Sequence, residues 1–265
     1  MKIKIFFLLI FFPLYLHTQT NFYKAFVNEG CFSEIWDAAE TPNGDYLIAL
    51  NNVRCPDVDS FTGSELIRIN KFGVILHNKK FNAHFTEIEN IGSIHVLPDG
   101  DIFVVTEVFI PFKAERWLGF YRYDSNLKLK KSFRAMIEDT LQYMSILKSS
   151  YEANKQRVVF HFTDGEFNSY AGWIGTNCQG FKISTIRKVD FLLDLCPRLD
   201  SAGYVFSHYG ERYILDSTLQ VTNKTAAGTY DFFTTYMKPY KNKYLTLSTE
   251  SFGFPPTFYD VPFFI

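Results

Sequence analysis

Four acidic residues are the side chains most able to do chemistry in this sequence. Asp37, Glu40, Glu107 and Asp164 lie within or beside apolar, strand-like segments. A glycosidase needs two carboxyl groups about 5 to 9.5 Å apart, one of them with a raised pKa. The sequence does not say which two converge. A hydrolase of this kind is therefore one hypothesis for the function, and no catalytic residue is assigned.

Two further carboxylates, Asp45 and Asp101, occupy the same place in two copies of one motif. Thr41-Pro-Asn-Gly-Asp45 and Leu97-Pro-Asp-Gly-Asp101 each place an aspartate directly after a turn glycine. A repeated carboxylate is compatible with catalysis or calcium binding. Because the repetition follows the turn, it favours a structural role in which the aspartate bonds the loop backbone.

Neither a metal nor a cofactor is indicated. The histidines that strand-like segments carry are scattered along the chain, at His77, His84, His95, His161 and His208. The loop Cys55-Pro-Asp-Val-Asp-Ser60 begins like a calcium loop, but an EF-hand counted from Asp57 needs Gly and Glu where Thr62 and Arg68 stand. No nucleophile elbow, zinc-protease, P-loop or dinucleotide motif occurs.

The N-terminus predicts export. Lys2 and Lys4 precede a mostly apolar run from Ile5 to Leu16, which is shorter than the roughly 20 residues that cross a bilayer. This pattern is typical of a secretory signal peptide. We predict a signal peptide over 1–20, cleavage near Thr18 to Thr20, and a secreted or cell-surface protein with no membrane span after cleavage. The alternative is an uncut membrane anchor.

Four cysteines, Cys31, Cys55, Cys178 and Cys196, indicate disulfides in an exported chain. Three pairings are possible. Pairing of sequence neighbours closes loops of 24 and 18 residues (55 minus 31, 196 minus 178), each stabilising by about 3 kcal/mol. We predict Cys31 with Cys55 and Cys178 with Cys196. A metal site is the weaker alternative because no Cys-x-x-Cys pair is present.

Composition favours strands and excludes two classes of partner. The formal net charge is −1, so no long-range attraction to nucleic acid or to an anionic membrane is expected. The chain has 29 Phe and 16 Tyr, and aromatic residues favour strands. No low-complexity linker divides residues 21–265, which we assign to one monomeric domain.

Turn signals recur along the chain at the spacing of a propeller blade. They lie at Asn43-Gly44, Asp99-Gly100, Asn154-Lys-Gln156, Ala202-Gly203 and Lys241-Asn242. Each precedes a strand-like run, and several units continue with a second hairpin, such as 64–70 with 74–80. The sequence predicts an all-β fold, a β-propeller of about five four-stranded units. We place these units near 31–81, 88–134, 143–190, 198–225 and 230–265.

Other segments complete the prediction. Residues 133–147 have the apolar spacing of a short helix. Residues 51–63 and 166–179 are polar and are predicted as long loops on one rim. Residues 21–27 offer a strand to close the ring. Two arrangements stay open: a compact five-bladed ring, or an incomplete part of a larger one.

Two segments resemble repeats of the large secreted and cell-surface β-propeller proteins of Bacteroidetes. They are Trp36-Asp-Ala-Ala-Glu-Thr-Pro-Asn-Gly-Asp-Tyr-Leu-Ile-Ala-Leu50 and Leu66-Ile-Arg-Ile-Asn-Lys-Phe-Gly-Val-Ile-Leu76. The resemblance covers residues 35–133. It implies a propeller fold and type IX secretion, although the family's C-terminal sorting domain is not recognisable. Its motifs specify structure, so they identify no functional residue here.

Trp173 is a possible ligand contact. If residues 166–179 form a rim loop, its ring can stack on a sugar or anchor a protein, but burial against the next blade is the favoured interpretation. The first hypothesis is therefore an exported, non-catalytic propeller that binds a glycan or a protein through the 51–63 and 166–179 rim. The glycosidase is the second hypothesis, and a fragment of a larger surface protein is the third.

Overall fold

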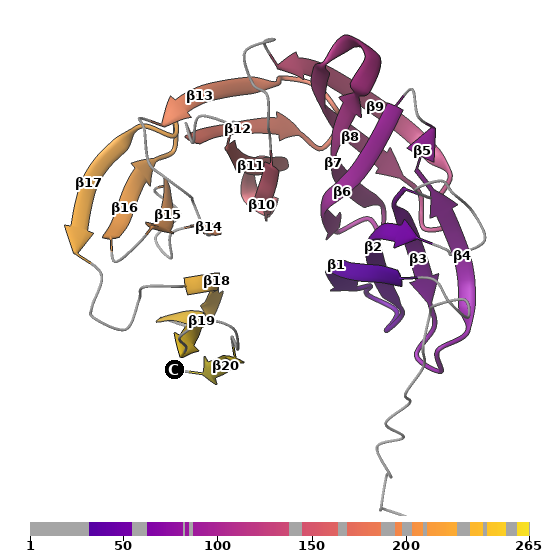
Figure 1. Cartoon of the computed structure of the whole chain (residues 1–265), viewed down its shortest axis with the longest axis horizontal. Helices are drawn as coiled ribbons and strands as arrows, with labels where there is room; N and C mark the ends of the chain where they lie inside the picture. The colour runs from indigo at the N-terminus through magenta and orange to yellow at the C-terminus, as the bar shows by residue number, and fades with distance from the viewer. Residues whose placement is uncertain are drawn as a thin grey trace, which may run out of the picture.

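The computed structural model contains five antiparallel sheets arranged in an arc (Figure 1). The structure describes residues 32–54, 63–81, 83–84, 87–137, 145–163, 169–186, 194–197, 203–208, 211–226, 234–240, 243–252 and 259–264. The signal peptide predicted over 1–20 and the closing strand predicted over 21–27 lie outside these residues.

The strands follow the chain order within each sheet, which we call blades one to five. Blade one contains β1 (Phe32–Glu40), β2 (Tyr46–Arg54), β3 (Glu65–Ile69) and β4 (Ile75–Lys80). Blade two contains β6 (Glu87–Val96), β7 (Ile102–Ile110), β8 (Glu115–Tyr123) and β9 (Leu129–Ile137), and the two-residue strand β5 (Ala83–His84) pairs with β6 at the edge of the sheet. The strands and turns of blade two are counted from β6. Blade three contains β10 (Ser145–Glu152), β11 (Arg157–Thr163), β12 (Ser169–Gly175) and β13 (Lys182–Ile186).

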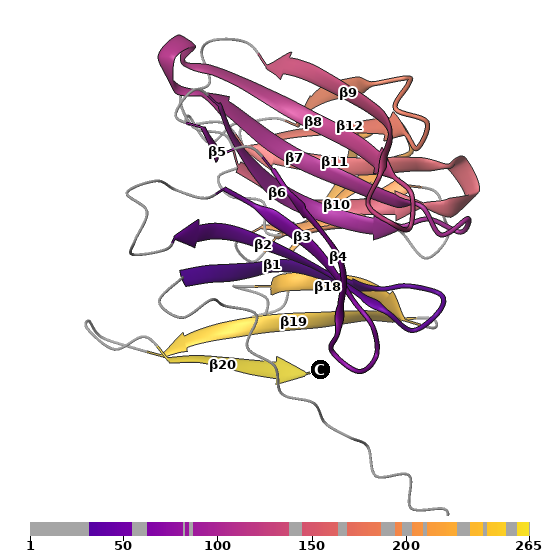
Figure 2. The same cartoon turned by 90° about the vertical axis from the view of Figure 1, so that its right-hand side faces the viewer.

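Blades four and five complete the arc. Blade four contains β14 (Asp194–Pro197), β15 (Gly203–His208), β16 (Glu211–Asp216) and β17 (Val221–Ala226). Blade five contains β18 (Thr234–Tyr240), β19 (Lys243–Phe252) and β20 (Tyr259–Phe264). Seen from the side, the strands of successive blades are stacked (Figure 2). The predicted all-β propeller architecture is confirmed, as an open arc whose described strands do not pair the first blade with the last.

Two predicted segments are corrected. The helix expected over 133–147 is wrong at both of its described ends, because residues 133–137 belong to β9 and residues 145–147 to β10. β9 pairs with β8 along its length, and these ladder bonds outweigh a weak helical periodicity. The loop expected over 166–179 is also wrong, since β12 occupies 169–175 between β11 and β13.

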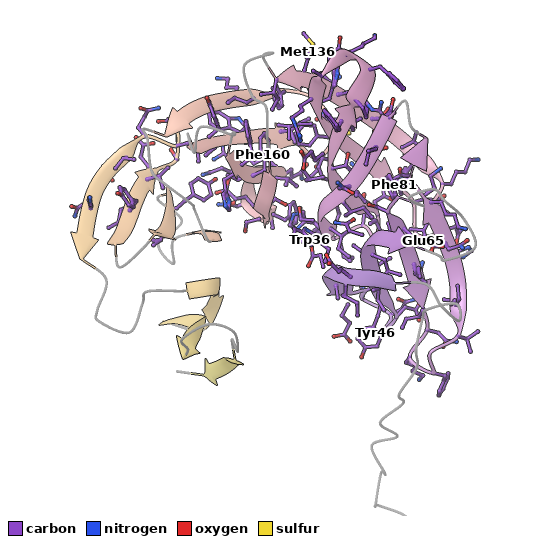
Figure 3. All side chains as sticks on the ribbon, in the orientation of Figure 1. Trp36, Tyr46, Glu65, Phe81, Met136 and Phe160 are labelled. Carbon is purple, nitrogen blue, oxygen red and sulfur yellow. The ribbon has the colours of Figure 1, made fainter. Side chains whose placement is uncertain are left out.

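The core lies between the blades. Phe120 of blade two packs on Phe160 of blade three with ring centroids 5.1 Å apart, within a fully buried cluster (Figure 3). Equivalent clusters join blades one and two and blades three and four. Each blade therefore depends on its neighbours for burial of its apolar faces.

In blades two to four, a residue in the left-handed conformation projects from the third-to-fourth-strand turn into the preceding blade. Leu127, Cys178 and Leu219 have φ of 61°, 61° and 69° and are all buried. Each belongs to the cluster shared with the blade before it. The left-handed conformation costs about 1–2 kcal/mol outside glycine. Burial of a leucine side chain, worth about 1.5–3 kcal/mol, offsets that cost.

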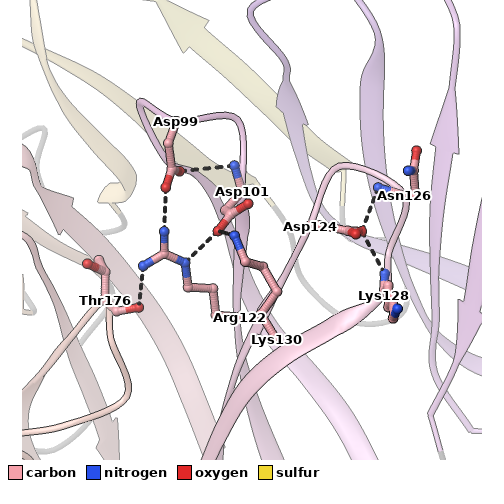
Figure 4. A network of polar contacts seen from close by, with 8 residues as sticks. All are labelled: Asp99, Asp101, Arg122, Asp124, Asn126, Lys128, Lys130 and Thr176. Carbon is pink, nitrogen blue, oxygen red and sulfur yellow. Dashed lines mark hydrogen bonds and ion pairs between the residues drawn. The ribbon is translucent and has the colours of Figure 1, made fainter.

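An arginine near the same turn links blades one, two and three each to the following blade. Arg68 pairs with Asp45 at 2.7 Å and donates to the backbone oxygen of Ser125 in blade two. Arg122 pairs with Asp101 at 2.7 Å and donates to the oxygen of Thr176 in blade three at 3.3 Å (Figure 4).

Arg157 makes the third link. It pairs with Glu152 and donates to the oxygen of Ser217 in blade four at 3.1 Å. Like Ser125 and Thr176, Ser217 lies two residues before the left-handed residue of its turn. We call these three contacts the arginine bridges. Because the acceptor is the same backbone position each time, they hold successive blades in equivalent arrangements.

Asp101 shows the charge balance of a bridge. Burial raises the pKa of Asp101, but hydrogen bonds from Lys130 and Arg122, and their charges, outweigh burial, so this pKa lies below its ordinary value. The carboxylate is ionised at neutral pH and needs its cations.

We expect Arg122→Met to lower the free energy of unfolding by about 3 kcal/mol, because it leaves the buried Asp101 carboxylate without its main partner. Urea denaturation at pH 7 measures this. Lys130→Met is the matched control, because Lys130 binds the same carboxylate but is 48% exposed; we expect a loss below about 1 kcal/mol. Equal losses of unfolding free energy in the two variants would contradict a special role for the Arg122 bridge.

Candidate functional site on the inner strands

The first strands of the blades lie on the concave side of the arc (Figure 1). β1, β6 and β10 each have a break in register at the same step, between Ile35 and Asp37, between Ile91 and Ser93, and between Ile146 and Lys148. A bulge of this kind bends a strand and redirects its side chains. Trp36, the extra residue in β1, remains 42% exposed and donates its Nε1 hydrogen to the oxygen of Gly92 at 3.1 Å.

Asp37 connects the inner strands of blades one and two. Its Oδ2 accepts the backbone N–H of Ile94 at 2.8 Å, and its Oδ1 accepts that of Ala38 at 2.9 Å. Both carboxylate oxygens therefore serve backbone donors. This arrangement positions β6 beside β1 and makes Asp37 a structural acceptor.

A histidine and two serines connect blades two and three. The Nε2 atom of His95 lies 2.5 Å from the Oγ atom of Ser149, which also contacts the hydroxyl of Ser93. Burial lowers the pKa of His95 to about 4, so its imidazole is neutral at neutral pH. A neutral imidazole on a serine hydroxyl resembles part of a catalytic triad, which also requires an acidic group that orients the histidine. In the described part of the chain no such group pairs with His95, so we interpret the contact as a link between blades.

A hollow of about 480 Å³ opens beside these strands, between the first turns of blades one and two. Its lining consists of Glu40, Thr41, Pro42, Val96, Leu97 and Pro98. Glu40 is its single charged residue. The hollow therefore combines apolar walls with one carboxylate.

Both turns that form the hollow are held rigidly. The N–H of Thr41 donates to the oxygen of Asp45 at 2.8 Å, and the N–H of Leu97 donates to the oxygen of Asp101 at 2.8 Å. Gly44 and Gly100 close the turns with φ of 80° and 82°, a conformation that favours glycine. Since Asp45 and Asp101 also bind the bridge arginines, the hollow is preformed.

Asp45 and Asp101 are structural, as the turn motif predicts, but their carboxylates bond side chains where loop backbone was expected. Asp45 binds Arg68 and Asn43, and Asp101 binds Arg122 and Lys130. Sequence reasoning missed Arg68 and Arg122. A signal for them exists, because both lie two residues before an Asn or Asp that begins the next turn, at Asn70 and Asp124. The third bridge arginine, Arg157, begins the second strand of its blade and gives no such signal.

The four candidate catalytic carboxylates do not form a pair in the described part of the chain. Asp37 and Glu40 lie three residues apart on β1, so they face opposite sides of the sheet. Glu107 lies on β7, where burial raises its pKa to about 7 and the bonded Arg116 opposes the rise. Asp164 lies outside the described residues.

Trp173 lies on β12 and not on a rim loop. It pairs with Val159 and Lys182 across its two neighbouring strands. The Arg157 guanidinium lies 4.8 Å from its ring centroid and the Lys182 ammonium 5.5 Å. The ring packs half-buried against the cluster between blades three and four. These contacts account for Trp173 without a ligand.

The rim predicted to bind a ligand is divided between two ends of the blades. Residues 55–62 and 164–168 connect the second strand to the third in blades one and three, and both lie outside the described residues. The turn at 176–181 connects β12 to β13, at the opposite end of blade three. The 51–63 and 166–179 segments therefore do not belong to one rim.

No group of three His, Cys, Asp or Glu side chains is placed to hold a metal ion among the described residues. His77, His95 and His161 lie on strands of three different blades. His84 and His208 lie on β5 and β15. Within the same residues, no helix has the length and hydropathy needed to cross a membrane.

Cys178 carries a free thiol in the structure. Its Sγ lies 3.9 Å from the oxygen of Phe120, so the thiol faces blade two, whereas Cys196 belongs to β14 of blade four. The structure therefore shows Cys178 without the predicted disulfide to Cys196. Cys31 and Cys55 lie outside the described residues, and their pairing stays a prediction.

Comparison with known proteins supports the fold. No family model matches the chain, and no curated protein matches its sequence. A protein of unknown function from Bacteroides caccae is similar with a TM-score of 0.58 and 11% identity, over 82% of this chain and 72% of that one. Raptor from Chaetomium thermophilum is similar with a TM-score of 0.56 and 11% identity, over 87% of this chain and 21% of that one.

A further similar structure is the β-propeller domain of Cps50 (Swd1) from Myceliophteria thermophila, with a TM-score of 0.48 and 6% identity, over 92% of this chain and 73% of that one. At such low identities the likeness shows the fold alone. Of the predicted resemblance to exported Bacteroidetes propellers, the propeller fold is supported, and one similar structure comes from a Bacteroides species. Type IX secretion stays a prediction.

Burial raises the pKa of the Cys178 thiol to about 11, which predicts an unreactive thiol in the folded protein. We expect iodoacetamide to label Cys178 in denaturant without reductant, and not in the native protein. Peptide mass spectrometry of the two samples measures this. If labelling in denaturant occurs only after reduction, that result would support the predicted Cys178–Cys196 disulfide.

The lowered pKa of His95 predicts acid-sensitive stability. The unfolded chain binds a proton below about pH 6.5, whereas folded His95 binds one only near pH 4. Stability therefore falls as the pH decreases from 6.5 to 4, by about 3 kcal/mol. In His95→Gln we expect this component to disappear from urea denaturation curves, whereas His77→Gln on the edge strand β4 should keep it. An unchanged pH dependence in His95→Gln would refute the assignment.

Proposed function

We infer that this chain is an exported, non-catalytic binding protein that holds a polypeptide segment in the hollow between the first turns of blades one and two. The observation that carries the proposal is the preformed, open hollow itself, whose lining mixes apolar side chains with Thr41 and Glu40. A surface that is already shaped favours binding because little ordering is required when a ligand enters.

The polar groups of the inner strands support binding rather than catalysis. Asp37 accepts two backbone donors, and His95, Ser93 and Ser149 bond one another between blades. Groups committed to such bonds are costly to redirect toward a substrate. Export is part of the proposal and rests on the N-terminal segment 1–20.

The lining of the hollow indicates the chemistry of its ligand. Pro42, Val96 and Pro98 offer apolar contact, and Glu40 offers an acceptor for a cation. A peptide with an apolar side chain next to a lysine or arginine matches both features. A neutral glycan would use hydroxyl donors and an aromatic platform, of which Trp36 is the exposed example on β1.

We expect peptides selected by phage display on immobilised chain 21–265 to carry a basic residue beside an apolar one. Glu40→Arg should weaken the selected peptides at least tenfold in a titration, because it replaces attraction by repulsion at the same place. Phe112→Ser is the matched control, since Phe112 is 79% exposed at the other end of blade two.

Three outcomes would contradict this function. They are a selection without enrichment, equal binding by the wild-type protein and Glu40→Arg, and a glycan array that retains the protein through Trp36 while no peptide binds. The first two would remove the hollow as a peptide site. The third would assign the inner strands to glycan binding.

A further inference from the structure

Charge is distributed unevenly across the strands of blades one to four. The first strands β1, β6, β10 and β14 contain a single cation, Lys148, beside Glu34, Asp37, Glu40, Glu87, Glu89, Glu152 and Asp194. The fourth strands β4, β9, β13 and β17 contain no carboxylate beside Lys79, Lys80, Lys130, Lys131, Arg134, Lys182 and Lys224. The first strands lie on the concave side of the arc and the fourth strands on its convex side (Figure 1). The convex side is therefore basic.

The net charge of −1 hides this separation of charge. The first and fourth strands of a blade are three strand spacings apart, which is about 14 Å. At physiological ionic strength, interactions between exposed charges are largely screened beyond about 8 Å. A ligand that lies on the fourth strands is therefore attracted by their cations, and the carboxylates of the first strands are too distant to oppose that attraction.

Each of the four fourth strands contributes an exposed lysine whose neighbour across the sheet is not a carboxylate. We call these residues the outer lysines: Lys79, Lys131, Lys182 and Lys224. Their cross-strand neighbours are Leu66, Arg122, Trp173 and Tyr213. Lys130 and Arg134 differ from them, because both form ion pairs with carboxylates of blade two.

Aromatic rings hold two of the outer lysines. The Nζ atom of Lys182 lies 5.5 Å from the ring centroid of Trp173, and that of Lys224 lies 5.2 Å from the ring centroid of Tyr213. A cation–π contact positions an ammonium group without cancelling its charge. Both rings pack on the cluster between blades three and four. That interface therefore has a positioned lysine on each side.

Protection of the sheet edges is the alternative explanation for these lysines. A charged side chain on an edge strand prevents pairing with another chain. Glutamate would also interrupt such pairing, yet the fourth strands of blades one to four contain no carboxylate. Edge protection alone does not explain this choice of sign, and the choice indicates a surface that attracts an anion.

We propose that the fourth strands of blades one to four form a docking surface for a linear acidic polysaccharide, held by the outer lysines. The cations are spread over the convex side of several blades. A flexible polymer can follow this curvature and contact several lysines at once, which strengthens individually weak contacts. A flat bilayer would meet only part of a convex surface. The surface is separate from the hollow, so the proposal does not rest on the proposed function.

The fourth strands fit a polysaccharide better than two other anionic polymers. Each lies at a sheet edge, where unpaired backbone groups can bond sugar hydroxyls. An acidic peptide would have to pair along the edge, but β4, β9 and β17 each begin with a break in register, which interrupts pairing. Nucleic acid strands are held by stacking on aromatic rings, and no exposed aromatic side chain lies on the described residues of these strands.

Dextran sulfate and dextran are matched probes, because they share a backbone and differ in charge. We expect the purified protein to bind dextran sulfate, and not dextran, in a calorimetric titration at about 0.15 M NaCl. The triple variant Lys79→Gln, Lys131→Gln, Lys182→Gln should bind dextran sulfate at least about tenfold more weakly. The slope of log affinity against log salt should also fall by about two, because fewer counterions are released on binding.

The matched control is the triple variant Lys71→Gln, Lys113→Gln, Lys155→Gln. It changes the net charge by the same amount, but its lysines lie in the β3–β4 turn and in the short helices η2 and η3. We expect the control to bind dextran sulfate within about twofold of wild type. Thermal unfolding checks that both variants fold. If the first does not, the single variants Lys131→Gln and Lys182→Gln replace it, each with an expected loss of affinity of about threefold.

Three results would overturn the proposal. Equal weakening in the two triple variants would show that binding depends on net charge and not on the outer lysines. No binding of dextran sulfate would leave the outer lysines with edge protection as their role. Tighter binding to single-stranded DNA, or to vesicles of phosphatidylglycerol, than to dextran sulfate would assign the surface to another class of anion.

Discussion

The arc depends on arginines that each bond groups in two neighbouring blades. A guanidinium has donors on both sides of a rigid plane, so Arg122 neutralises Asp101 within its own blade and donates to Thr176 in the next. A buried aspartate that loses its cation costs about 3–5 kcal/mol, and a buried carbonyl without a donor costs about 1–3 kcal/mol. The bridge therefore couples the first turn of each blade to the placement of its neighbour.

That coupling shapes the candidate site. The turns that form the hollow are the same turns whose aspartates bind the bridge arginines. The hollow thus has its shape before any ligand arrives, and it is built from elements that cannot move without breaking a link between blades. Polar groups on the inner strands are used in the same way, since Asp37 and His95 each join two blades. Both side chains therefore serve as connections between blades.

Local signals in the sequence predicted much of the fold. The Pro-Asn-Gly-Asp and Pro-Asp-Gly-Asp turns are set by residues next to one another, so the strands around Gly44 and Gly100 follow from sequence. Contacts between distant residues were not predictable in this way. β9 formed where apolar spacing suggested a helix, because pairing with β8 determines its conformation. Trp173 was a possible ligand contact and Cys178 a predicted disulfide residue. Trp173 instead packs against the cluster between blades three and four, and Cys178 faces Phe120 of blade two, so their surroundings depend on how whole blades pack.

The left-handed turn residues show how local and long-range demands are balanced. Glycine would adopt φ near 60° without strain, yet Leu127, Cys178 and Leu219 occupy that position in blades two to four. Their side chains fill the preceding interface, and the burial they gain is comparable to the strain they add. Gly73 is the exception, and it lies in blade one, the blade at the start of the described arc. In blades two to four, the side chain at this turn position packs into the described blade before it. The packing of that neighbouring blade, and not the conformation of the turn, therefore determines which residue occupies the position.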